Sequence, residues 1–72
     1  MKLISKGEAL ERLQINMGFN RFSLGEGEDI EGSDKKQLYI YLRYRRDTAF
    51  VRNLFNNYLN INVVYMGEIK AS

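Results

Sequence analysis

The clearest strand signal in the chain lies in the segment Gln37–Arg46, which reads QLYIYLRYRR. Residue types alternate along it, and alternate side chains of a strand point to opposite faces of a sheet. We therefore predict a strand over residues 37–46 with two different faces. One face is expected to belong to the core: Leu38, Ile40, Leu42 and Tyr44. The opposite face then carries Tyr39, Tyr41, Arg43 and Arg45.

Amphipathic helices are predicted on both sides of this strand. Before it, Ser5 and Glu8 fit the capping-box pattern, and an apolar stripe follows, so we predict a helix over residues 6–17. After it, Asp47 is a suitable N-cap for a second helix over roughly residues 48–59, where apolar residues recur at helical spacing.

Two more strands are predicted, over residues 19–24 and residues 61–70. The expected order is helix, strand, strand, helix, strand. If residues 1–4 add a first strand, the order becomes βαββαβ, which is the ferredoxin-like arrangement; otherwise it is αββαβ. In both cases we expect an α+β two-layer sandwich, in which an antiparallel sheet carries two helices on one face. Its other face is then open to solvent or to a partner.

Composition limits the chemistry available to this chain. Its 72 residues allow one domain, residues 1–72, and include no Cys and no His. Disulfides, thiolate or imidazole metal sites and Ser-His or Cys-His nucleophiles are therefore excluded. We expect no enzyme activity, no cofactor and no metal. No apolar run is long enough to span a membrane, and no signal-peptide core follows Met1, so a cytoplasmic protein is expected.

An acidic, Gly-rich loop is predicted over residues 25–36. Its acidic part runs from Glu26 to Asp34 and contains five carboxylates. The spacing of these carboxylates does not match a calcium-binding loop. We expect a solvated loop, with a negative surface for a basic partner as the alternative. The second half of the chain is basic, although the net charge is only +2.

The open face of the sheet is the candidate binding surface. Tyr and Arg are enriched in the hot spots of protein interfaces, and exposed apolar residues beside them suggest a covered patch. Six residues are candidates for partner contacts: Tyr39, Tyr41, Arg43, Arg45, Val64 and Met66. We expect a larger protein, or a second copy of the chain, to bind there. Small stand-alone proteins of this size are often accessory or inhibitor proteins that act on a larger protein, and some are of viral origin; we expect such a role.

Single-stranded nucleic acid is the alternative partner. In that case Tyr39 and Tyr41 stack on bases, and the arginines at 43, 45 and 46 hold phosphates. The layout is analogous to that of RNA-recognition domains, but their characteristic RNP1 pattern is absent. The chain also contains a group of asparagines that are able to hydrogen-bond a partner, although codon bias in an AT-rich genome explains them as well and is the explanation that we prefer: Asn53, Asn56, Asn57, Asn60 and Asn62.

Overall fold

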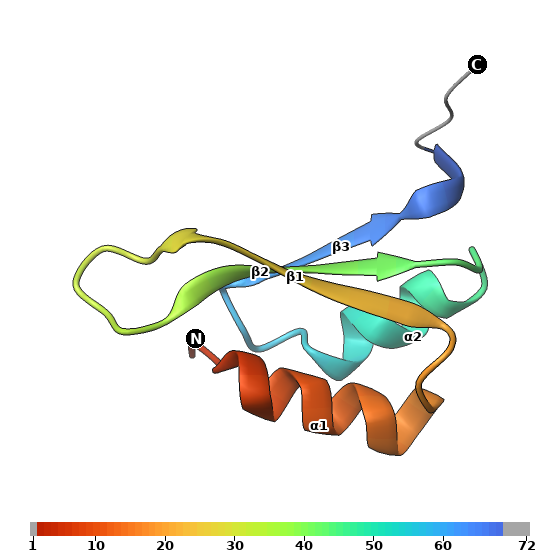
Figure 1. Ribbon diagram of the computed structural model, residues 1–72, viewed down its shortest axis with the longest axis horizontal. Helices are drawn as coiled ribbons and strands as arrows, with labels where there is room; N and C mark the ends of the chain where they lie inside the picture. The colour runs from red at the N-terminus through yellow and green to blue at the C-terminus, as the bar shows by residue number, and fades with distance from the viewer. Residues whose placement is uncertain (1, 69–72) are drawn as a thin grey trace.

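The computed structural model describes residues 2–68 of the chain (Figure 1). Its elements are α1 (Lys6–Met17), β1 (Phe22–Asp29), β2 (Lys36–Leu42), α2 (Asp47–Leu54), β3 (Ile61–Tyr65) and the 3₁₀ helix η1 (Met66–Glu68). The helices and strands therefore follow the order αββαβ. Lys2 forms only an isolated bridge with Tyr58, and Met1 lies outside the described residues. The ferredoxin-like arrangement is not confirmed.

The sheet is mixed, with the strand order β1-β2-β3. β1 and β2 are antiparallel, whereas β2 and β3 are parallel. The prediction of an antiparallel sheet is therefore wrong for β3. The reason is that α2 carries the chain back along the sheet before β3 begins, and this crossover makes two adjacent strands run in the same direction. Because β2 and β3 pair directly, no further strand lies between them.

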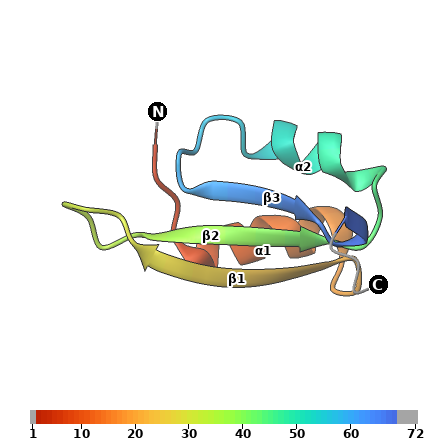
Figure 2. The same ribbon diagram turned by 90° about the horizontal axis from the view of Figure 1, so that it is seen from above.

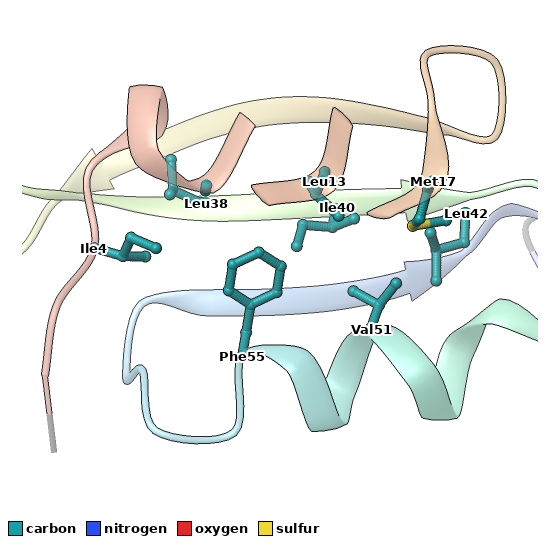
Figure 3. Packing of buried hydrophobic residues seen from close by; sticks show 9 residues of the cluster. Ile4, Leu13, Met17, Leu38, Ile40, Leu42, Val51 and Phe55 are labelled. Atoms are coloured by element: carbon teal, nitrogen blue, oxygen red, sulfur yellow. The ribbon is translucent and has the colours of Figure 1, made fainter. Parts of the chain in front are cut away.

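Both helices lie on one face of the sheet, as predicted (Figures 1 and 2). α1 lies beneath the middle of the sheet, and α2 lies toward the β3 side (Figure 2). Their buried side chains meet those of β2 in a single core (Figure 3). The buried core residues are Ile4, Ala9, Leu13, Met17, Leu38, Ile40, Leu42, Val51 and Phe55. The predicted inward set of β2 is thus confirmed at three positions.

The prediction that Tyr44 is the fourth core residue of that set is wrong, because Tyr44 is 45% exposed. β2 ends at Leu42, although the backbone N–H of Arg43 still donates to the Arg21 carbonyl at 3.4 Å. The chain then turns, and the N–H of Asp47 donates to the Tyr44 carbonyl at 3.1 Å to begin α2. This turn takes Tyr44 out of the strand alternation.

Two other predicted elements, the second helix and the last strand, are too long. α2 ends at Leu54, and residues 55–60 form turns instead of continuing the helix to 59. β3 ends at Tyr65 and is followed by η1; the predicted strand residues 69 and 70 lie outside the described part. The asparagines after α2 favour turns over helix because their side chains compete for backbone hydrogen bonds.

The predicted loop over residues 25–36 is also corrected. Its first five residues, Gly25 to Asp29, belong to β1, and residues 30–35 connect β1 to β2. β1 is able to continue through two glycines because tyrosine rings from β2 cover them. A Cβ on Gly27 would lie 2.7 Å from the Tyr39 ring, and one on Gly25 would lie 3.3 Å from the Tyr41 ring. Aromatic side chains across the ladder compensate for glycine in a strand in this way.

Asn60 has a structural role that the sequence analysis did not assign. Its side chain is fully buried, and its Oδ1 accepts from the Ile4 N–H at 2.9 Å. Its Nδ2 donates to the carbonyls of Ile4, at 2.7 Å, and Lys36, at 2.8 Å. Attributing this asparagine to codon bias is therefore wrong. A single buried amide holds the segment before α1 against the start of β2, where an apolar residue would leave backbone groups unpaired.

An ion pair between a partly exposed arginine and a buried aspartate lies at the other end of the sheet. The Asp47 carboxylate is 4% exposed and accepts two hydrogen bonds from Arg21, one of them from Nε at 3.1 Å. The hydrogen bonds from Arg21 hold the pKa of Asp47 below its ordinary value, although burial opposes them. The same bond raises the pKa of Arg21. The pair ties the segment between α1 and β1 to the start of α2.

Candidate partner-binding face

The sheet face opposite the helices is uncovered by the described residues, as Figure 1 shows. We call it the open face. The strand registers and the alternation of side chains place these residues on it: Ser23, Gly25, Gly27, Gln37, Tyr39, Tyr41, Asn62 and Val64. None of them is charged. The face is therefore aromatic and polar in the middle, and its charges lie only at its ends.

Two tyrosine rings form the centre of the open face. The rings of Tyr39 and Tyr41 are stacked, with centroids 6.5 Å apart and planes inclined by 25°. Both side chains are half-buried, since each lies against a glycine of β1 instead of standing away from the sheet. A ring held in this way exposes a flat surface and loses little conformational freedom when it contacts a partner.

β3 extends this surface on its other side. Val64 is the register partner of Tyr41, and Asn62 is the register partner of Tyr39. The Asn62 amide donates to Gln37 Oε1 at 2.9 Å and to the Leu38 carbonyl at 3.0 Å. These bonds fix the polar side chains around the rings. The structure thus brings Tyr39, Tyr41 and Val64 onto one face, as the sequence analysis expected.

The predicted arginines do not stay together on this face. Arg43 is exposed and extends the tyrosine row by one position beyond β2, since its N–H donates to the carbonyl of Arg21, just before β1. Arg45 instead lies in the turn before α2 and lines a groove between that helix and β3. The guanidinium of Arg46 lies 4.9 Å from the centroid of the Tyr44 ring. The continuous Tyr-Arg row predicted for residues 39–45 is therefore broken after Arg43.

Met66 lies beyond the end of β3, in η1, and its side chain is 45% exposed. η1 turns to the side of the sheet away from the helices (Figure 1). Met66 therefore belongs to the border of the open face and not to its strand ladder. Its exposed thioether adds a flexible apolar group of the kind that adapts to different partner surfaces.

The acidic residues gather at the opposite end of the molecule, around the β1–β2 connection. Three of the five carboxylates pair with lysines: Glu26 with Lys6 at 2.9 Å, Asp29 with Lys36 at 2.6 Å, and Asp34 with Lys35 at 2.9 Å. Hydrogen bonding to Lys35 lowers the pKa of Asp34, and hydrogen bonding to Asp29 raises that of Lys36. Much of the negative charge is thus balanced locally.

Other kinds of site find little support in the part of the chain that the structure describes. Within residues 2–68, the acidic side chains form no group of three or more that could hold a metal ion. No described helix combines the length and apolar character needed to cross a bilayer. Comparison of the chain with protein-family models, curated protein sequences and solved structures finds no match.

Two features of the site were missed in the sequence analysis. The glycines at 25 and 27 were assigned to a loop, although Gly-x-Gly has the same two-residue period as Tyr-x-Tyr at 39–41. That shared period was a usable signal of a ladder in which rings cover glycines. The groove beside Arg45 is also lined by Arg52 of α2, and its other wall consists of residues of β3, which pairs parallel with β2.

Proposed function

We propose that this protein is a non-catalytic binding protein and that its open face contacts a protein partner. The observation that carries the proposal is the pair of tyrosine rings, which are fixed over glycines in the middle of an uncovered, uncharged sheet face. Protein hot spots have this character: rigid aromatic groups in the centre, few charges among them, and polar or charged groups around the border. Arg43 and Met66 occupy that border.

The arrangement of the arginines favours a protein over single-stranded nucleic acid. A nucleic-acid strand that stacks on Tyr39 and Tyr41 needs cations along the path of its phosphates. Of the three arginines considered for that role, only Arg43 extends the tyrosine row, while Arg45 and Arg46 lie against other parts of the molecule. A small accessory or inhibitor protein is the role that we propose for such a surface.

A pair of variants with matched charge changes tests the proposal. Tyr41→Asp places a carboxylate at the centre of the open face, whereas Asn56→Asp places one on an exposed turn outside that face. The wild-type protein is immobilised and used to capture partners from lysate of its source cells. We expect the specific partner to be lost with Tyr41→Asp and kept with Asn56→Asp. Equal capture by both variants contradicts the proposal.

Sedimentation of the purified protein tests the case in which the partner is a second copy. A dimer that Tyr41→Asp dissociates and Asn56→Asp preserves assigns the open face to self-association. Fluorescence anisotropy with random-sequence single-stranded RNA and DNA tests the competing function. Micromolar binding that weakens with salt at a log–log slope of about −0.7 per phosphate, and that is lost with Tyr41→Ser, transfers the open face to nucleic acid.

A further inference from the structure

β3 leaves one side of its backbone unpaired within the described residues. It is the outer strand in the order β1-β2-β3, and it pairs only with β2. The Leu38 N–H donates to the Asn60 carbonyl at 2.8 Å, which fixes the phase of this parallel ladder. Backbone groups alternate in direction along such a strand. Those of Asn62 and Val64 therefore point to β2, and those of Val63 and Tyr65 point to the free edge.

Proteins usually protect such an edge, and within residues 2–68 β3 lacks three of the usual protections. Edge strands are commonly blocked by a charged residue, a proline or a bulge. The β3 sequence INVVY contains no charge and no proline, and its pairing with β2 has no register shift. An unprotected edge of this kind is a template for strand addition, in which an extended peptide extends the sheet.

A groove lies along this edge. It has a volume of about 350 Å³, and three consecutive residues of β3 form one wall: Val63, Val64 and Tyr65. The other wall consists of four residues at helical spacing in and just before α2: Arg45, Thr48, Ala49 and Arg52. Because three successive strand residues line it, the groove follows the backbone edge and not a single side chain.

The charge of the groove indicates what fits it. Arg45 and Arg52 line the same wall of the groove, and neither forms an ion pair with any carboxylate of residues 2–67. The one acidic residue of α2, Asp47, is buried against Arg21 and cannot neutralise them. A strand added to β3 would turn every second side chain toward α2 and its two arginines.

We propose that the free edge of β3 and the arginines of α2 bind an acidic peptide in extended conformation, by strand addition. Its backbone pairs with Val63 and Tyr65, and carboxylates at alternate positions meet Arg45 and Arg52. This site is separate from the tyrosine rings of the open face and does not depend on the function proposed above. Val64 borders both surfaces.

A synthetic probe tests this inference without knowledge of the natural partner. The probe is a fluorescein-labelled peptide of eight residues in which glutamate alternates with threonine. One control peptide has lysine in place of glutamate, and a second keeps the glutamates but has proline in place of threonine. We expect anisotropy to show binding of the first peptide only, because the lysine peptide has the wrong charge and proline prevents strand pairing.

Three charge-matched variants locate the binding. Arg45→Gln and Arg52→Gln should each weaken binding about threefold to fivefold, as expected for one partly exposed ion pair, and the double variant about tenfold or more. Arg43→Gln removes the same charge from the border of the open face and should leave binding within about twofold. Tyr41→Ser should also leave it unchanged, which separates this site from the open face. Equal weakening by Arg43→Gln and Arg52→Gln overturns the proposal, because it indicates unspecific attraction.

Amide hydrogen exchange of the full chain tests the strand addition itself. In the free protein, the amides of Asn62 and Val64 should exchange slowly, and those of Val63 and Tyr65 should exchange fast. Saturation with the glutamate-threonine peptide should slow the second pair about tenfold or more, as new hydrogen bonds form. Binding that leaves Val63 and Tyr65 exchanging as before overturns strand addition, even if the arginine variants behave as expected.

Discussion

The two faces of β2 differ although a single strand of seven residues forms both of them. Leu38, Ile40 and Leu42 are buried beneath the helices, while Tyr39 and Tyr41 remain half-buried on the open face. On the buried face, side chains from three elements fill the space, so each position is tied to several neighbours. On the open face, each ring lies mainly on a glycine. By alternation alone, one strand therefore separates the core from the surface that we propose for partner binding.

The largest difference between the faces should appear when side chains are truncated. Ile40→Ala removes a fully buried side chain and should cost about 2–5 kcal/mol, which is a large part of the stability of a small domain. Tyr39→Ala should cost less, since its ring is only half-buried. Urea denaturation measures both.

Because Ile40→Ala can leave the chain unfolded, Ile40→Val serves as a second variant. It should cost about 0.5–1.5 kcal/mol. If Tyr39→Ala destabilises the protein more than Ile40→Ala does, the claim that the buried face of β2 contributes more to stability than the open face is wrong.

The next largest effect on the free energy of unfolding is expected at Asn60. Asn60→Ala removes three hydrogen bonds to backbone groups of Ile4 and Lys36 and should cost about 2–3 kcal/mol. Asn56→Ala, at an exposed turn position, is the matched control and should stay within about 0.5 kcal/mol of the wild type. Thermal unfolding of the two variants measures the difference in their stability. Similar melting temperatures for both would show that the buried amide contributes little.

A smaller effect, visible in its pH dependence, is expected from the Arg21–Asp47 pair. The pKa of Asp47 is lowered on folding, so its ionised form stabilises the native state above the ordinary pKa of 3.8. That contribution is lost as the pH falls through the lower, folded pKa. Asp47→Asn should therefore cost about 1–2 kcal/mol at pH 7 and progressively less below pH 4. Urea titrations from pH 7 to 2.5 test this, and a constant difference over that range contradicts it.

The smallest effect on stability should come from the glycines beneath the rings. A Cβ at Gly27 would lie 2.7 Å from the Tyr39 ring, which is able to move because it ends a flexible side chain. Gly27→Ala should therefore change stability by less than about 1 kcal/mol but displace the ring. The Tyr39 ring resonances in NMR spectra should shift, and partner binding should weaken. A Cβ at Gly25 would lie 3.3 Å from the Tyr41 ring, so Gly25→Ala should displace that ring less and weaken partner binding less. Unchanged Tyr39 resonances in Gly27→Ala would show that the ring does not lie on this glycine.

The predictable part of the fold was the part with local causes. The N-cap bond of the expected capping box is present: the Glu8 N–H donates to the Ser5 hydroxyl at 3.2 Å, and α1 spans the predicted residues. The alternation from Leu38 to Leu42 gave the right buried and open faces for β2. Both signals depend on residues that are close in the sequence, so periodicity was sufficient to detect them.

The remaining features depend on contacts between distant residues. Tyr44 continues the strand alternation in sequence, but the chain turns between Leu42 and Asp47, whose carboxylate pairs with the distant Arg21. The direction of β3 depends on the path of α2 and on the hydrogen bonds of Asn60, which joins residues 56 positions apart. For the candidate site, the two-residue period was sufficient to predict that Tyr39, Tyr41 and Val64 share one face. It did not predict that Arg45 lies away from that face, in the turn before α2.

The most direct test of the open face is an affinity measurement with the captured and purified partner. Tyr41→Ser removes a ring from the centre of the open face, and Tyr44→Ser removes an exposed ring from the turn outside it. Calorimetry should give a dissociation constant about tenfold or more weaker for Tyr41→Ser, as expected for a central aromatic contact. Tyr44→Ser should stay within about twofold of the wild type. An unchanged affinity for Tyr41→Ser, or an equal loss for Tyr44→Ser, would contradict the assignment of the open face to partner binding.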